Sequence, residues 1–308
     1  MTSAADAKLR PGVEADYREA STQRGKGIRV ALIGVAIATV AFVGNLVALG
    51  QSGSEQGATL VWTFGVTTTG FALIKTAIAV VLWGIVLKLW LRADSLRAAL
   101  PSLIGSAGSD PTPLGDIETP FGAATVTEKA PGPLPIHKMA KKLFRPMLVM
   151  GLMAVIAGLV VSFVAAGSAP NPSALAWMQG LQFLGEGMLL SGVAFLLGTI
   201  LWAIRTAGGE IQESLGVKVY TPKMPALAKA FVALMMLGLV AEIVQFVGYI
   251  NISGSADPAS ALAWLGPLRE IGLGLILAGI ALALVAIGNV LSFQFFRVKN
   301  LIKNGERS

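Results

Sequence analysis

Residues 147–166 read MLVMGLMAVIAGLVVSFVAA, a run of twenty residues without a charge. A helix needs about 20 apolar residues to cross the hydrocarbon core of a bilayer, so this run predicts a membrane-spanning helix. Five other stretches are at least as long and also mostly apolar. The six predicted spans are Val30–Gly50, Thr59–Leu91, Met147–Ala166, Ala174–Ile204, Ala226–Ile250 and Gly266–Phe296.

The composition of the whole chain agrees with these spans. Of its 308 residues, 54% are hydrophobic and 13% are charged, whereas soluble domains carry about 25% charged residues. This excludes an ordinary soluble domain and an intrinsically disordered protein. The chain has no cysteine and one histidine, which excludes disulfides, iron–sulfur clusters, thiolate zinc sites and bis-histidine haem. Motifs for phosphate, dinucleotide or zinc binding are also missing, so we expect a protein that is not an enzyme and has no cofactor or metal.

The lysines and arginines predict the orientation in the membrane. The short connections Gln51–Ala58, Gly167–Ser173 and Asn251–Ala261 contain none, and 22 of the 24 lie in the tails, the long connections and the adjoining helix ends. By the positive-inside rule, both termini and both long loops are cytoplasmic, and we expect the membrane to be a bacterial plasma (inner) membrane. The net charge of +7 then reflects this orientation and contact with the lipid bilayer, and we expect no nucleic-acid partner.

Glycines and tryptophans recur with the same spacing in three segments. Residues 173–177 and 260–264 both read SALAW, at an offset of 87 residues, and the first segment follows a more divergent version of the pattern. We therefore predict an all-α integral membrane protein of six helices, arranged as three repeated helical hairpins that either surround an axis or lie side by side. The recurring positions are Gly34, Gly151 and Gly238; Trp62, Trp177 and Trp264; and Gly70, Gly185 and Gly272.

The hairpins and their connections divide the chain into seven parts. The second helix of each hairpin is longer than a bilayer requires, and we expect the surplus to protrude into the cytoplasm. The parts are a polar cytoplasmic N-terminal tail (1–29), hairpin 1 (30–91), a Pro/Gly-rich cytoplasmic loop (92–146), hairpin 2 (147–204), a second cytoplasmic loop (205–225), hairpin 3 (226–296) and a cytoplasmic C-terminal tail (297–308). Within the first loop, Arg92–Leu100 can form an amphipathic helix, and Ser102–Pro135 is expected to be irregular or extended.

Two sets of residues have expected structural roles. The tryptophans fall at the predicted outer interface, where an amphipathic indole ring anchors a helix; they are Trp62, Trp177 and Trp264. Small residues allow helix backbones to approach each other in lipid. On this basis we expect helix packing at Gly187, Gly192, Gly274 and Gly279.

Three ionisable residues lie deep within the predicted spans, one in each hairpin: Lys75, Glu186 and Glu242. Their depths below the outer surface are about 20, 14 and 18 Å at the helical rise. Charges at such depths are costly and need partners or water. Three interpretations of these residues stay open: an ion or proton path, a polar cluster that fixes helix contacts, and a contact with another subunit. Because the depths match, we hypothesise that Lys75 pairs with one of the two glutamates.

Three other ionisable residues are expected to be solvated. Arg269 and Glu270 follow Pro267 near the outer surface, in what the spacing predicts to be the first turn of the last helix. His137 stands in a Pro-rich cytoplasmic stretch beside Lys138, which favours an interfacial histidine with no catalytic role.

These observations favour a non-catalytic membrane subunit that scaffolds, anchors or assembles a larger complex with other membrane protein subunits. The alternative is a transporter or channel for an ion or small solute, working through Lys75, Glu186 and Glu242. No substrate class follows from the residues.

Overall fold

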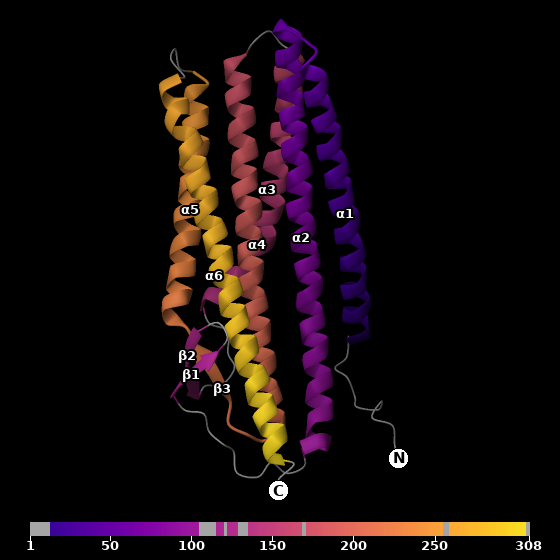
Figure 1. The fold of residues 1–308 in the computed structure, drawn as a ribbon, viewed down its shortest axis with the longest axis vertical. Helices are drawn as coiled ribbons and strands as arrows, with labels where there is room; N and C mark the ends of the chain where they lie inside the picture. The colour runs from indigo at the N-terminus through magenta and orange to yellow at the C-terminus, as the bar shows by residue number, and fades with distance from the viewer. Residues whose placement is uncertain are drawn as a thin grey trace.

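The computed structural model describes residues 13–104, 115–119, 122–128, 135–167, 171–254 and 259–305. Six long helices run along one axis, and three short strands gather near one end of the bundle (Figure 1). The helices are α1 (Val13–Ala48), α2 (Gly53–Ile104), α3 (Pro135–Gly167), α4 (Pro172–Ser214), α5 (Pro225–Ile252) and α6 (Ala259–Gly305). The strands are β1 (Gly115–Thr119), β2 (Gly122–Glu128) and β3 (Tyr220–Lys223).

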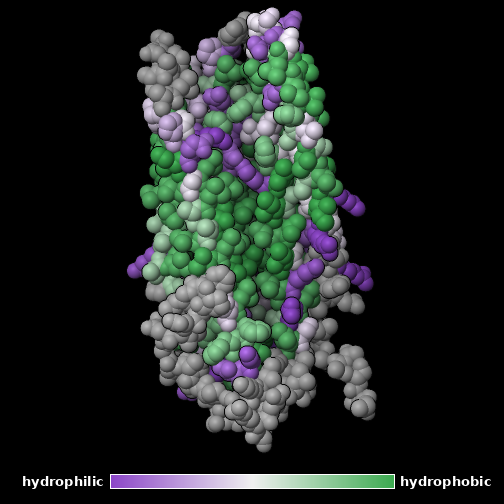
Figure 2. All heavy atoms as spheres, viewed as in Figure 1, coloured by the Kyte–Doolittle hydropathy of each residue, from purple (hydrophilic) through white to green (hydrophobic). Residues whose placement is uncertain are grey.

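All six helices are long and apolar enough to cross a membrane, which identifies an integral membrane protein. Large apolar side chains point away from the bundle, among them Leu32 on α1 with 64% of its surface exposed and Met153 on α3 with 65%. Figure 2 shows hydrophobic surface over most of the middle of the molecule, between hydrophilic residues nearer its two ends. A surface of this kind is solvated by lipid chains.

Helix α4 is the centre of the bundle. In its most apolar stretch 78% of the residues are buried, against 17% in α1. Each odd-numbered helix packs on its successor; α2 also packs on α3 and α4, and α4 on α5 and α6. No comparable interface joins α1 to α6 among the described residues. The hairpins therefore lie side by side in an open row, as Figure 1 also shows, and do not close around an axis.

The second helix of each pair extends well past the length of a span. Helices α2, α4 and α6 have 52, 43 and 47 residues, and they reach beyond α5 at the end of the bundle that carries the strands (Figure 1). We call this the sheet end and the opposite end the short-loop end. The helices also begin earlier than the spans predict, because α1 starts at Val13 within the predicted tail and α3 at Pro135 within the predicted loop.

The loop expected to be irregular or extended contains strands β1 and β2. They form an antiparallel hairpin, and β2 pairs antiparallel with β3 from the second loop, with Val126 opposite Pro222. Pro222 is tolerated because β3 is an edge strand. The sequence pattern does not indicate this sheet, because β3 is distant in sequence from β1 and β2, and the Gly- and Pro-rich first loop favours irregular chain.

A buried polar cluster fastens β3 to the long helices. Gln212 of α4 accepts a hydrogen bond from the Tyr220 backbone N–H at 3.0 Å and donates one to its carbonyl at 3.1 Å. The Arg297 guanidinium on α6 is 1% exposed; it donates to the Gln212 side chain at 3.3 Å and lies over the Tyr220 ring. Arg297, which the sequence places in the cytoplasmic tail, is thus part of the core.

The two helices of each hairpin cross at a pair of glycines. A Cβ atom on Gly70 would lie 2.8 Å from the Gly34 carbonyl oxygen, and one on Gly185 would lie 2.6 Å from that of Gly151. In the third pair, a Cβ atom on Gly238 would lie 3.0 Å from the Gly272 carbonyl oxygen. Backbone is in contact with backbone at each crossing, so a larger residue would push the helices apart.

Of the glycines expected at helix contacts, three lie against a neighbouring helix. Gly187 faces Glu242 of α5, Gly192 faces Leu148 of α3, and Gly279 faces Met235 of α5. The prediction is wrong for Gly274, which meets open space among the described residues. Residues two apart on a helix point about 200° apart, so Gly272 faces α5 while Gly274 faces outward.

We predict that Gly185→Ala destabilises the bundle. The added methyl group would overlap backbone atoms of α3, at a cost of about 1–3 kcal/mol. This exceeds the gain of up to about 1 kcal/mol from replacing glycine by alanine in a helix. Thermal unfolding of the detergent-solubilised protein, followed by circular dichroism, measures the change. Gly274→Ala is the matched control and should keep or raise the midpoint; equal midpoints for both variants would contradict the proposed role of the crossing.

Candidate functional site: intramembrane charges

Glu186 of α4 joins two other helices through its two carboxylate oxygens. Its Oε1 forms an ion pair with Lys75 Nζ of α2, and its Oε2 accepts a hydrogen bond from Arg269 Nη2 of α6 at 2.8 Å. The three side chains are 16–26% exposed. The expected pairing of Lys75 with a glutamate is confirmed. One carboxylate thus connects one helix from each hairpin.

The three charges lie at successive depths from the short-loop end. Counted from the tryptophan in its own helix, Arg269 is about 8 Å in, Glu186 about 14 Å and Lys75 about 20 Å. The order is positive, negative, positive, and each contact joins helices that run in the same direction (Figure 1). The series therefore leads from near the short-loop end toward the middle of the bundle.

The structure corrects the expectation that Arg269 is solvated. Helix α6 begins at Ala259, so Arg269 is nearly three turns inside it and faces α4. The guanidinium also lies 4.2 Å from the centre of the Phe183 ring and pairs with Glu270 at 2.9 Å. Glu270 has 71% of its side chain exposed, in agreement with its expected solvation.

Glu242 of α5 is the exception among the deep charges. It is 1% exposed, and neither carboxylate oxygen has a hydrogen-bond partner among the described residues. Two glycines make room for it: a Cβ atom on Gly187 would lie 2.5 Å from Glu242 Cγ, and one on Gly272 would lie 2.8 Å from its Oε1. Glu242 is therefore enclosed between α4 and α6 without a direct contact to Lys75 or Arg269.

Two buried glutamines continue the polar region. Gln182 of α4 is fully buried, with neither amide atom hydrogen-bonded in the described part of the chain. Gln245 of α5 donates to the Leu265 carbonyl at 3.3 Å, while its own side-chain oxygen has no partner there. Unpaired polar groups in an apolar interior cost free energy. Packing alone therefore does not explain why these two positions carry polar side chains.

The tryptophans lie within the first three turns of the second helix of each hairpin. Trp62 packs on Gly44 of α1, Trp264 packs near Gly248 of α5, and the Trp177 ring lies 6.2 Å from that of Phe246. Trp177 and Trp264 are 38% and 47% exposed. Their role as membrane anchors stays a prediction. Among the described residues, no three or more His, Asp or Glu side chains form a group that could hold a metal ion.

His137 was expected to be solvated, and this is wrong. It is 3% exposed at the start of α3, where it faces α4. Helix α3 begins two residues earlier, at Pro135, so His137 belongs to the helical face that packs inward.

We predict that Glu186→Gln destabilises the protein more than Lys75→Gln. Loss of Glu186 leaves two cations unpaired, whereas loss of Lys75 leaves the pair with Arg269 intact. Removing one partner of a buried ion pair costs about 3–5 kcal/mol, and the partial exposure of these side chains places Glu186→Gln at the lower end of this range. Thermal unfolding in detergent measures the order. Glu242→Gln is the matched control, because it removes no hydrogen bond; an equal loss there would contradict the prediction.

No protein family, curated protein or solved structure matches this chain. The function is therefore inferred from the residues themselves. Two features of the site carry that inference: a carboxylate shared by two cations, and a second carboxylate buried without a partner.

Proposed function

We propose that the protein is a non-catalytic integral membrane subunit that scaffolds, anchors or assembles a larger membrane protein complex. The observation that carries this proposal is the Glu186 bridge to Lys75 and Arg269, because it uses three intramembrane charges to hold three hairpins together. Polar contacts between helices serve as such fasteners in lipid. A row of hairpins leaves exposed apolar side chains, such as Leu32 of α1 and Met153 of α3, for lipid or other subunits.

The sheet end suits attachment to a partner. Here α2, α4 and α6 extend past the membrane span, and α4 and α6 hold a small sheet through Gln212, Arg297 and Tyr220. The distribution of lysine and arginine supports a cytoplasmic location for this end and for both termini, in a bacterial plasma membrane. The glycine crossings shared by the three pairs support the view that they are repeated hairpins.

The test is purification of the tagged full-length chain from its native membranes in mild detergent. We predict that it elutes with other membrane proteins in a fixed stoichiometry that persists through gel filtration, and that Glu186→Gln reduces their recovery at least threefold. Gly274→Ala should leave recovery unchanged. A chain that elutes alone at every detergent concentration would contradict the proposal.

A second candidate function is a transporter for protons or small ions, and it is favoured by Glu242. A carboxylate that is buried in the membrane without a hydrogen-bond partner can bind and release a proton or cation. Gln245, three residues further along α5, adds a side-chain oxygen that has no partner among the described residues. This function is an alternative to the scaffold function, which does not explain why a carboxylate is buried at Glu242.

Flux through liposomes containing the purified protein separates the two functions. If the protein is a transporter, a pH gradient drives the uptake of protons or small ions into the liposomes. Glu242→Gln then reduces this uptake at least tenfold, whereas Glu270→Gln, at an exposed carboxylate, leaves it unchanged. We expect instead no flux above that of protein-free liposomes for either variant or the parent chain. Uptake that depends on Glu242 would overturn the scaffold proposal.

A further inference from the structure

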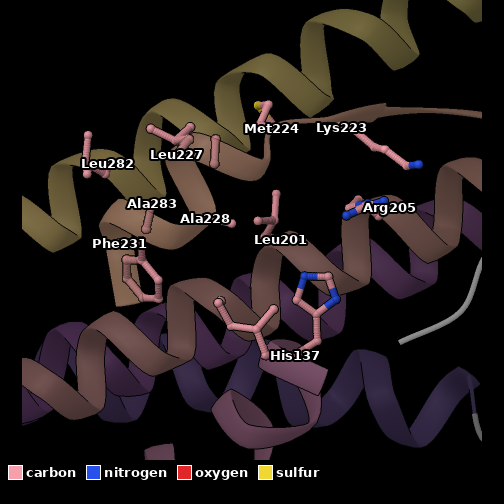
Figure 3. Close-up of a pocket in the computed structure, with 13 residues that line it drawn as sticks. His137, Leu201, Arg205, Lys223, Met224, Leu227, Ala228, Phe231, Leu282 and Ala283 are labelled. Carbon is pink, nitrogen blue, oxygen red and sulfur yellow. The ribbon is translucent and has the colours of Figure 1, made fainter. Parts of the chain in front are cut away.

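A pocket of about 230 Å³ lies between α3, α4, α5 and α6 near the sheet end (Figure 3). For comparison, an engineered apolar cavity of about 150 Å³ holds benzene, so this pocket has room for part of an acyl chain. Most of its lining is aliphatic or aromatic, and no lining residue is acidic. Its apolar lining includes Leu201, Leu227, Phe231, Leu282 and Ala283.

Three basic residues line the same pocket: His137, Arg205 and Lys223. Arg205 and Lys223 have no ion pair or hydrogen bond from their side chains to any described residue. Only 3% of the surface of His137 is exposed, and its Nδ1 has no hydrogen-bond partner among those residues. Figure 3 shows its ring turned toward Arg205. The pocket thus has donors and positive charge that no residue in the described part of the chain pairs with.

The basic and apolar residues occupy different ends of the pocket. Figure 3 shows His137, Arg205 and Lys223 grouped on one side, with Phe231 and Leu282 on the other. Along α4 the chain runs from Leu201 to Arg205 toward the sheet end. The basic side therefore faces the end of the bundle, and the apolar side faces the middle of the membrane span. This is the polarity of a membrane lipid with its headgroup at the interface.

We infer that this pocket binds an anionic phospholipid, with the phosphate at the basic side and part of an acyl chain along Phe231 and Leu282. Arginine pairs with phosphate through two parallel hydrogen bonds, and lysine adds a point charge. Basic pockets between membrane helices are suited to anionic headgroups. The bilayer supplies the ligand directly, and this inference stands independently of the scaffold and the transporter. A free fatty acid shares the chemistry of an anionic head on an acyl chain, and the experiment separates the two.

Native mass spectrometry of the full-length protein, released from detergent with added lipid, tests the inference. We expect phosphatidylglycerol to remain bound at least tenfold more than phosphatidylcholine with the same acyl chains. Oleate and inorganic phosphate, added separately, should each bind at least tenfold less than phosphatidylglycerol. Each loss of a charge-assisted contact is expected to weaken binding about tenfold.

Paired variants locate the site. Arg205→Gln and Lys223→Gln remove the charge, and Ala228→Phe fills the apolar part; each should reduce retained phosphatidylglycerol about tenfold. The matched controls Lys229→Gln and Ala230→Phe change neighbouring exposed residues of α5 that do not line the pocket, and they should bind as the parent does. Thermal unfolding confirms that each variant is folded.

Five results would overturn the inference. If the two phospholipids are retained equally, the protein does not select an anionic headgroup. If the pocket variants bind phosphatidylglycerol as the controls do, the lipid does not bind in this pocket. Loss of binding in Arg205→Gln but not in Ala228→Phe means that the headgroup adsorbs without an inserted chain. Oleate bound more than phosphatidylglycerol assigns the pocket to a fatty acid, and displacement by inorganic phosphate alone assigns it to a free anion.

Discussion

The fold depends on close contact between helix backbones in a solvent that does not drive helices together. Lipid chains are as apolar as leucine, so burying a leucine between membrane helices gains little. What remains is the packing of surfaces that fit closely. The chain meets this constraint with three glycine crossings, at which backbone atoms of paired helices meet. Between the hairpins, apolar residues of α2, α4 and α5 share one core, and the ion pairs of Glu186 add polar contacts to it.

At the third glycine crossing, between α5 and α6, close backbone packing also makes room for an ionisable side chain. Glu242 stands four residues after Gly238, where the first two hairpins carry Ala38 and Val155. The carboxylate occupies space that Gly187 and Gly272 leave free. A charged residue has thus been placed at a crossing whose equivalents are apolar. Close packing explains how Glu242 fits, but it does not require a carboxylate, and this makes Glu242 the residue that distinguishes a transporter from a scaffold.

Position along a helix could be predicted from the sequence, whereas the direction in which a side chain points could not. The rise per residue placed Lys75 and Glu186 at similar depths, and they do pair. The face of each helix depends on a rotation of 100° per residue and on where the helix begins, so small errors reversed the environment of Gly274, His137 and Arg269. The β2–β3 pairing was missed for another reason, because the two strands are too far apart in sequence for any local pattern to indicate it. The β1–β2 hairpin is local, but the Gly- and Pro-rich composition of its loop favours irregular chain.

Two groups of basic residues are neutralised in different ways, and the difference follows from their depth in the membrane. Toward the short-loop end and the middle of the span, Lys75 and Arg269 share the carboxylate of Glu186, because an unpaired cation in hydrocarbon is costly. Near the sheet end, Arg205 and Lys223 line a pocket that contains no acidic residue. Cations left without an internal partner at that depth are stable where anionic headgroups lie within reach. The deep cations Lys75 and Arg269 are thus neutralised within the protein, whereas Arg205 and Lys223 are left to the lipid.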